Sequence, residues 1–157
     1  MKVKGIKSED FVNYYKPSIF IICPFCDFKC DRENGYSLCQ NSSLAHEPNI
    51  SISPMAIVNM YINNPITKAI VFGGLEPFDS WNELFDIIYH LRQKTNDDII
   101  IYTGYNKNEI LDKLEQLSQY KNIIVKFGRF RPDEEPHYDE VLGVKLASDN
   151  QYAERIS

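Results

Sequence analysis

Four short apolar runs constrain the fold of this chain more than any other feature. Each run is followed directly by a cysteine or a glycine, and the four occupy residues 19–22, 68–72, 98–103 and 123–127. Continuous apolar runs of this length are typical of strands buried on both faces of a parallel sheet. A helical pattern lies between each pair of successive runs, so the sequence predicts right-handed crossovers with helices packed on the sheet.

Three amphipathic helices are expected between and before these strands. Ser53 and Pro54 form a helix start, because an N-cap side chain precedes proline at the first helical position. Asp79 or Ser80 is expected to cap the next helix, with Glu83 completing a capping box if Ser80 is the cap. The expected apolar face of the first helix comprises Met55, Val58, Tyr61 and Ile62. That of the second helix comprises Trp81, Leu84, Phe85, Ile88 and Leu91, and that of the third comprises Ile110, Leu111, Leu114 and Leu117.

The remaining segments are interpreted as loops and short strands. Residues 3–6 and 141–146 are expected to form short strands, and residues 23–52 a long loop. Residues 131–140 have the composition of a solvated acidic loop, with a docking surface as the alternative, and a polar tail is expected after residue 146.

Length and charge further limit the number of domains and the kinds of partner expected for this chain. A chain of 157 residues is expected to form one domain, residues 1–157. Its formal charge of −5 does not favour binding to nucleic acid or to an anionic membrane. No apolar run approaches the roughly 20 residues of a membrane helix, and the start lacks the apolar core of a signal peptide. We therefore expect a cytoplasmic protein whose thiols stay reduced, so two disulfides are not expected.

All four cysteines, Cys23, Cys26, Cys30 and Cys39, follow the first apolar run. Ligands of parallel sheets bind beyond the carboxyl ends of the strands, so thiolates gathered there indicate a metal or cluster site. A zinc site is one interpretation, although the C-x2-C-x3-C-x8-C spacing lacks the paired knuckles of structural zinc. The other interpretation is a four-iron cluster held by three thiolates, which leaves one iron open for another ligand.

The cysteine segment resembles the C-x3-C-x-Φ-C signature of the radical S-adenosylmethionine (radical SAM) enzymes, in which Φ is aromatic or apolar. Cys26 and Cys30 match the first spacing, and Leu38-Cys39 is similar to the end of the signature, with residues 31–37 as an insertion. The resemblance implies that Cys26, Cys30 and Cys39 hold a [4Fe-4S] cluster, because Cys39-Gln40-Asn41 is similar to the family's C-x-N. It implies a buried, spare thiol for Cys23; Cys23 in place of one of the three ligands is the alternative.

Gly73-Gly74-Leu75-Glu76-Pro77 is similar to the family's GGEP motif, with Leu75 inserted. A glycine pair allows close approach of the backbone to a ligand. The resemblance implies that S-adenosylmethionine is bound by Gly73, Gly74 and Glu76 at its methionine end, by Leu38 at its adenine, and by Thr103 and Gly104 on the ribose side.

Three further segments, residues 101–105, 128–130 and 146–151, resemble those of activating proteins of anaerobic ribonucleoside-triphosphate reductases. The resemblance implies an α/β fold, a small, incomplete (open) radical SAM-type βα barrel with a parallel sheet. It implies reductive cleavage of S-adenosylmethionine to a 5′-deoxyadenosyl radical, which installs a glycyl radical on the large reductase subunit. A flavodoxin or ferredoxin is the implied electron donor.

Two alternatives to this activity remain. The first is a small-molecule radical SAM enzyme similar to 7-carboxy-7-deazaguanine synthase, and the second is a non-catalytic zinc-binding module. None of the histidines, His46, His90 and His137, lies in a pattern typical of a catalytic site, so no general base is assigned.

Overall fold

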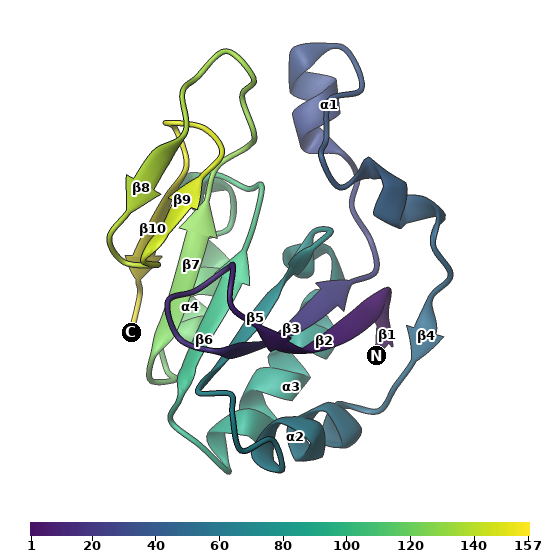
Figure 1. Ribbon diagram of the computed structural model, residues 1–157, viewed down its shortest axis with the longest axis vertical. Helices are drawn as coiled ribbons and strands as arrows, with labels where there is room; N and C mark the ends of the chain where they lie inside the picture. Colours follow the sequence, from purple (N-terminus) through teal and green to yellow (C-terminus); the bar gives the residue numbers. More distant parts are fainter.

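The computed structural model describes all residues, 1–157, and its centre is an open six-stranded sheet (Figure 1). Its strand order is β10-β7-β6-β5-β3-β2. The four predicted buried strands are confirmed and run parallel: β3 (Ser18–Cys23), β5 (Ala69–Gly74), β6 (Asp98–Tyr102) and β7 (Ile123–Phe127). Antiparallel edge strands flank them, β2 (Gly5–Asp10) and β10 (Tyr152–Arg155), so the sheet is mixed rather than purely parallel.

Strand β10 corrects the expectation of a polar tail. Ala153 is buried and pairs with Lys126 of β7, while the Tyr152 ring packs 5.4 Å from the Phe127 ring. The charged residues of β10 also have partners, because Glu154 binds Lys107 at 2.8 Å and Arg155 binds Asp98 at 3.0 Å. Pairing with distant residues therefore turns a polar sequence into an edge strand.

Two small antiparallel sheets complete the strands. β1 (Lys2–Val3) pairs with β4 (Ile50–Ser51), and β8 (His137–Asp139) pairs with β9 (Val144–Leu146). The expected acidic loop is thus wrong at its end, where β8 begins a hairpin. Buried Asp139 fixes this hairpin, since its carboxylate accepts hydrogen bonds from the amides of Leu142 at 2.9 Å and Ala153 at 3.0 Å.

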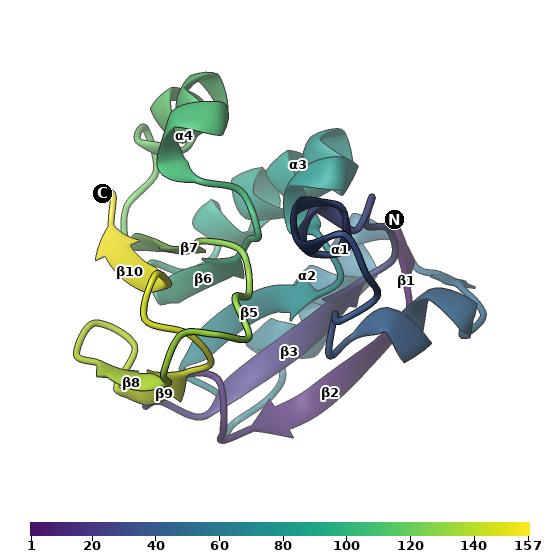
Figure 2. The same ribbon diagram turned by 90° about the horizontal axis from the view of Figure 1, so that it is seen from above.

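The helices α2 (Pro54–Ile62), α3 (Trp81–Arg92) and α4 (Leu111–Leu117) cover one face of the sheet (Figure 2). The Ser53 hydroxyl accepts a hydrogen bond from the Ala56 amide at 3.1 Å, which confirms the predicted start of α2. Its predicted apolar face is wrong for Met55 and Ile62, which are exposed. The prediction is confirmed for Val58 and Tyr61, which are buried together with Ile57, a residue that was not predicted.

Helix α3 buries Leu84, Ile87, Ile88 and Leu91, of which Ile87 was not predicted. The predicted capping box is wrong, because the Ser80 side chain makes no cap hydrogen bond. A short 3-10 turn, η2 (Pro77–Ser80), precedes α3, and the Glu76 side chain caps that turn. A second turn, η3 (Lys107–Glu109), leads into α4.

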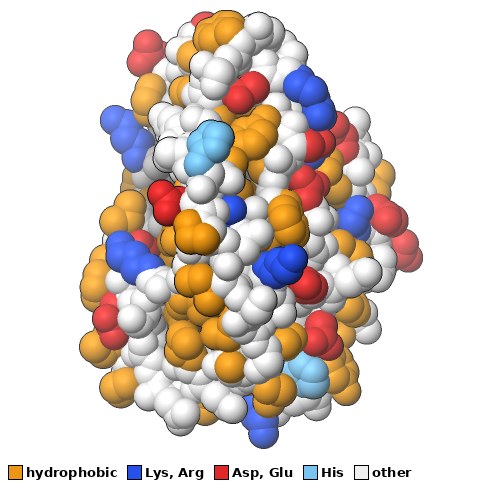
Figure 3. Space-filling model, turned by 90° about the vertical axis from the view of Figure 1, so that its right-hand side faces the viewer, with side chains coloured by type: hydrophobic (Ala, Val, Ile, Leu, Met, Phe, Trp, Pro, Cys, Tyr) orange, Lys and Arg blue, Asp and Glu red, His pale blue; other side chains and the backbone are white.

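The surface seen from the side of β1 and β4 carries Lys, Arg, Asp and Glu side chains interspersed (Figure 3). No continuous patch of a single charge sign is visible on this face. No helix combines the length and the apolar character needed to cross a membrane.

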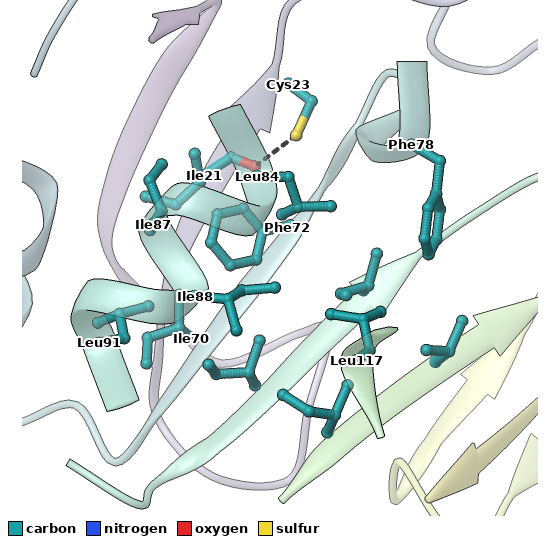
Figure 4. Close-up of a cluster of buried hydrophobic side chains, with 14 of the residues drawn as sticks. Ile21, Cys23, Ile70, Phe72, Phe78, Leu84, Ile87, Ile88, Leu91 and Leu117 are labelled. Atoms are coloured by element: carbon teal, nitrogen blue, oxygen red, sulfur yellow. Dashed lines mark hydrogen bonds between the residues drawn. The ribbon is translucent and has the colours of Figure 1, made fainter. Parts of the chain in front are cut away.

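The main core lies between the helices and the sheet and comprises 22 buried residues (Figure 4). Cys23 belongs to it: its thiol is fully buried, and its Sγ lies 4.0 Å from the Ile21 carbonyl oxygen. A smaller cluster on the opposite face contains Tyr14 and Leu142, contributed by the turn after β2 and by the β8–β9 hairpin.

Candidate metal and cofactor site

The cysteine segment rises from the carboxyl end of β3 and forms a short helix, α1 (Lys29–Asn34), above the sheet (Figure 1). The expectation of a continuous loop is wrong at this helix, and also at η1 (Ser42–His46). Phe28 enters α1 with a left-handed φ of 55°, and Gly35 ends it with a φ of 78°. The Gly35 amide donates to the Asp31 carbonyl at 2.9 Å, which closes the last turn of α1.

Asp31 folds the insertion between Cys30 and Cys39 back on itself. One oxygen of its side chain, Oδ1, accepts hydrogen bonds from the Leu38 amide at 3.0 Å and the Cys39 amide at 2.9 Å. This contact brings the chain back to the start of the helix that carries Cys30. The expanded spacing is therefore compatible with a compact group of cysteines.

Cys26, Cys30 and Cys39 line one cavity of about 510 Å³ at the carboxyl ends of the parallel strands. Four of the residues expected to bind the cofactor line the same cavity: Gly74, Glu76, Thr103 and Gly104. A β-carbon placed on Gly104 would lie 3.9 Å from the Cys30 sulfur, so this thiol lies close to the end of β6.

Three of the residues considered from the sequence lie outside the cavity lining. Cys23 points into the core, and Leu38 is half-buried beside Cys39. Gly73 packs within the sheet, where a β-carbon would lie 3.0 Å from the Phe20 ring and 3.3 Å from the Tyr102 Cβ. The absence of a side chain at Gly73 therefore allows the neighbouring strands to pack closely against it.

Backbone pairing joins residues 23–30, the cysteine turn, to residues 73–76, the glycine turn. Cys23 lies opposite Gly74 in the parallel pairing of β3 with β5. Beyond this pair, the Glu76 amide donates a hydrogen bond to the Phe25 carbonyl at 2.8 Å. The two motifs are thus in direct contact in the folded chain.

Glu76 connects the glycine turn to the end of β6. Its Oε1 accepts from the Thr103 hydroxyl at 2.7 Å and the Phe78 amide at 3.1 Å, and its Oε2 accepts from the Gly104 amide at 2.9 Å. Burial raises the pKa of Glu76 to about 7, against these hydrogen bonds, which favour the carboxylate. The Thr103 side chain and Gly104 amide therefore hold Glu76 in place.

The environment of Cys26 and Cys39 favours the protonated thiol in the absence of a metal. Burial raises the pKa of Cys26 to about 11, although the Phe28 amide at 3.2 Å from its sulfur and the charge of Lys29 oppose this rise. Burial also raises the pKa of Cys39. Thiolate ligation must therefore release protons, which couples metal binding to pH.

Lys126 is a cavity residue that the sequence pattern did not reveal, because it lies inside the apolar run of β7. Its ammonium group donates to the Gly128 carbonyl at 3.1 Å, and burial lowers the pKa of Lys126 to about 8. A lysine within an otherwise apolar strand is the signal that could have identified it.

None of the histidines lines this cavity. His90 is 3.5 Å from Asp86 on α3, His137 contacts the Gln151 carbonyl, and His46 is exposed in η1.

The donor set fits an iron–sulfur cluster, because three free thiols of one short segment line one cavity. A family model described as "4Fe-4S single cluster domain" matches residues 19–151. Neither the curated proteins nor the solved structures include a match to the chain. The family match covers the four parallel strands and every cysteine, and it favours iron–sulfur over zinc. This chain belongs to the 4Fe-4S single cluster domain family.

Proposed function

We propose that this protein is a radical SAM oxidoreductase that installs a glycyl radical on the large subunit of an anaerobic ribonucleoside-triphosphate reductase. One observation carries the proposal. The cysteine turn, the Gly74–Glu76 turn and the Thr103-Gly104 segment are joined by hydrogen bonds through Glu76 and line one cavity. A cluster protein whose only task is electron transfer does not need a cofactor-sized cavity beside its cysteines.

In this proposal Cys26, Cys30 and Cys39 are the cluster ligands. When bound, the cluster and S-adenosylmethionine would supply a one-electron reductive cleavage to methionine and a 5′-deoxyadenosyl radical, which would abstract a hydrogen atom from the glycine. The protein's own residues bind and orient these groups. Cys23 is excluded as a ligand in this assignment because its side chain is buried in the core.

The cavity residues suit the charged end of an amino-acid cofactor. The Glu76 carboxylate is buried, so a cationic amino group beside it would gain a strong ion pair. Lys126 offers a buried positive charge in the same cavity for an anionic group. Gly74 adopts a φ of +82°, and a β-carbon there would lie 2.6 Å from Ile22 Cγ2, so glycine is required at this turn.

The open sheet supports the incomplete barrel of the proposal. Four parallel strands carry helices on one face, and the sheet ends at β2 and β10 without closing. The exposed side chain of Val12 and the half-buried side chain of Phe130 line the cavity, so its walls reach the surface. Such a cavity suits a macromolecular substrate whose glycine-bearing segment must reach the reacting groups. We infer a flavodoxin or ferredoxin as donor and a cytoplasmic location, where a reduced cluster is maintained.

The test is anaerobic reconstitution followed by three assays on one preparation: iron and sulfide content, 5′-deoxyadenosine formation on reduction, and the glycyl radical spectrum of the added reductase. We expect about four irons per chain, cofactor cleavage, and a radical signal on the reductase. Cleavage without a glycyl radical would favour a small-molecule substrate. One zinc and no iron would favour a zinc-binding module, and either result would overturn the proposed activity.

A further inference from the structure

Lys29 is a buried cation in the cysteine segment, and its charge favours the thiolate form of Cys26. It lies directly before Cys30, and its side chain is only 8% exposed. Its ammonium group binds the Asp27 carboxylate, lies 3.6 Å from the Asp79 carboxylate, and sits 3.8 Å from the centroid of the Tyr105 ring. The sequence pattern does not explain why a lysine at the start of the polar helix α1 is buried.

These contacts fix the cysteine turn to two other elements. Asp79 belongs to the η2 turn, and Tyr105 follows β6. Asp79 is itself held, because it accepts from the Tyr105 hydroxyl at 2.8 Å and from the Asp27 amide at 3.3 Å. Lys29 therefore lies at the junction of the cysteine turn, the start of α3 and the loop after β6.

Lys29 supplies the least exposed positive charge in this group of ion pairs. The Lys29 ammonium group faces two carboxylates, Asp27 and Asp79, and Asp27 also binds Arg32 at 3.0 Å. The Arg32 side chain is 65% exposed, so water screens its charge, whereas the charge of Lys29 is largely shielded from solvent. Without Lys29 the partly buried Asp79 carboxylate would lose its ion-pair partner.

We propose that Lys29 is a positioning residue that also sets the reduction potential of the cluster, by placing a buried positive charge within the cysteine segment, directly before Cys30. The step concerned is the uptake of one electron by the oxidised cluster, [4Fe-4S]²⁺ to [4Fe-4S]⁺, from a one-electron reductant. This electron adds negative charge to a group already bound by thiolates, so a nearby cation favours the reduced form. The inference rests on the cluster ligands of the proposed function, and it does not depend on the substrate.

The test is a potentiometric titration of the reconstituted protein with mediators and dithionite. The reduced cluster is measured at each potential by its electron paramagnetic resonance signal. Lys29→Met is expected to lower the ratio of reduced to oxidised cluster at a fixed potential by about tenfold, the typical effect of removing one partly buried unit charge. Lys29→Arg keeps the charge and should titrate like the wild type. Arg32→Met is the matched control and should change the ratio less than twofold, because its charge is exposed.

A charge-restoring double variant separates the electrostatic role from a purely structural one. Lys29→Met combined with Asp79→Asn removes one charge of each sign, so it should return the potential toward that of the wild type although it breaks more contacts. An unchanged potential in Lys29→Met, or iron loss in Lys29→Met that the double variant does not reverse, would overturn the inference.

The proposed function fails in a different measurement. A wild-type protein that assembles no cluster would overturn both ideas. A wild-type cluster that does not cleave S-adenosylmethionine would overturn the proposed activity, while the potentials of the variants would still decide the role of Lys29.

Discussion

Asp31→Ala is the most informative single change in the cysteine segment. One oxygen of Asp31 holds the amides of Leu38 and Cys39, at 3.0 and 2.9 Å, and these two bonds return the inserted residues to the helix that carries Cys30. A hydrogen bond to a charged acceptor contributes roughly 1.5–3 kcal/mol. Because Asp31 is half-exposed, we discount the pair to about 2 kcal/mol in total.

That loss should affect the cluster rather than the fold. Free energy of about 2 kcal/mol corresponds to roughly a thirtyfold weaker retention of iron, since 1.36 kcal/mol is tenfold. The apoprotein should keep its thermal midpoint within about 2 °C, because none of residues 29–34 belongs to the main core. The assay is the release of iron to a competing chelator under anaerobic conditions, with circular dichroism melting of the apoprotein as the check on folding.

Two variants sharpen this prediction. Asp31→Asn keeps an acceptor oxygen without the charge, so its iron retention should fall between those of Asp31→Ala and the wild type. Tyr36→Ala lies in the same insertion with an exposed side chain and should retain iron normally. If Asp31→Ala holds iron as tightly as the wild type does, the Asp31 carboxylate does not position Cys39 for the cluster and the reasoning is refuted.

Three further predictions follow from the site and the core. Alanine at any proposed ligand should abolish cluster assembly in iron and sulfide analysis, whereas Cys23→Ala should retain it; iron loss in Cys23→Ala would contradict the assignment for Cys26, Cys30 and Cys39. Gly74→Ala should lower the free energy of unfolding of the apoprotein by about 2 kcal/mol in urea titrations, because φ is +82° and the new methyl would meet Ile22. At the buried Asp98, burial raises the carboxyl pKa, but hydrogen bonds from Lys16, Tyr14 and Arg155 outweigh it and hold the pKa of Asp98 below its ordinary value. The stabilisation that Asp98 gives the fold is therefore present above the unfolded-state pKa of about 4 and is lost as the pH falls through the lower folded value. Relative to the wild type, Asp98→Asn should lose roughly 3 kcal/mol of unfolding free energy at pH 7 and less at pH 3. An equal loss at both pH values would count against this role of Asp98.

The sequence predicted those parts of the fold that depend on local apolar pattern. The strands β3, β5, β6 and β7 were identifiable because burial on both faces requires continuous apolar runs. Strand β10 was missed because its charged residues find partners far away in the chain, as Arg155 does at Asp98. Helix α1 was missed because its six residues show no apolar face, and it is defined by the turn at Gly35 and the contacts of Asp31.

The site was predictable in its motifs and less so in its supporting residues. The cysteines, Glu76 and Thr103 stand out by residue type and by position at strand ends. Lys29, Asp31 and Lys126 do not, because a single charged residue in a short helix or a strand gives no pattern until its partners are placed in space. The burial of Lys29 depends on Asp79 and Tyr105, which are distant in sequence.

The most direct measurement is the amount of 5′-deoxyadenosine formed per cluster when the reconstituted protein is reduced with S-adenosylmethionine present. We predict formation by the wild type and by Cys23→Ala, and none by Cys39→Ala. A wild-type protein that carries a full [4Fe-4S] cluster, accepts an electron and yields no 5′-deoxyadenosine would contradict the central claim.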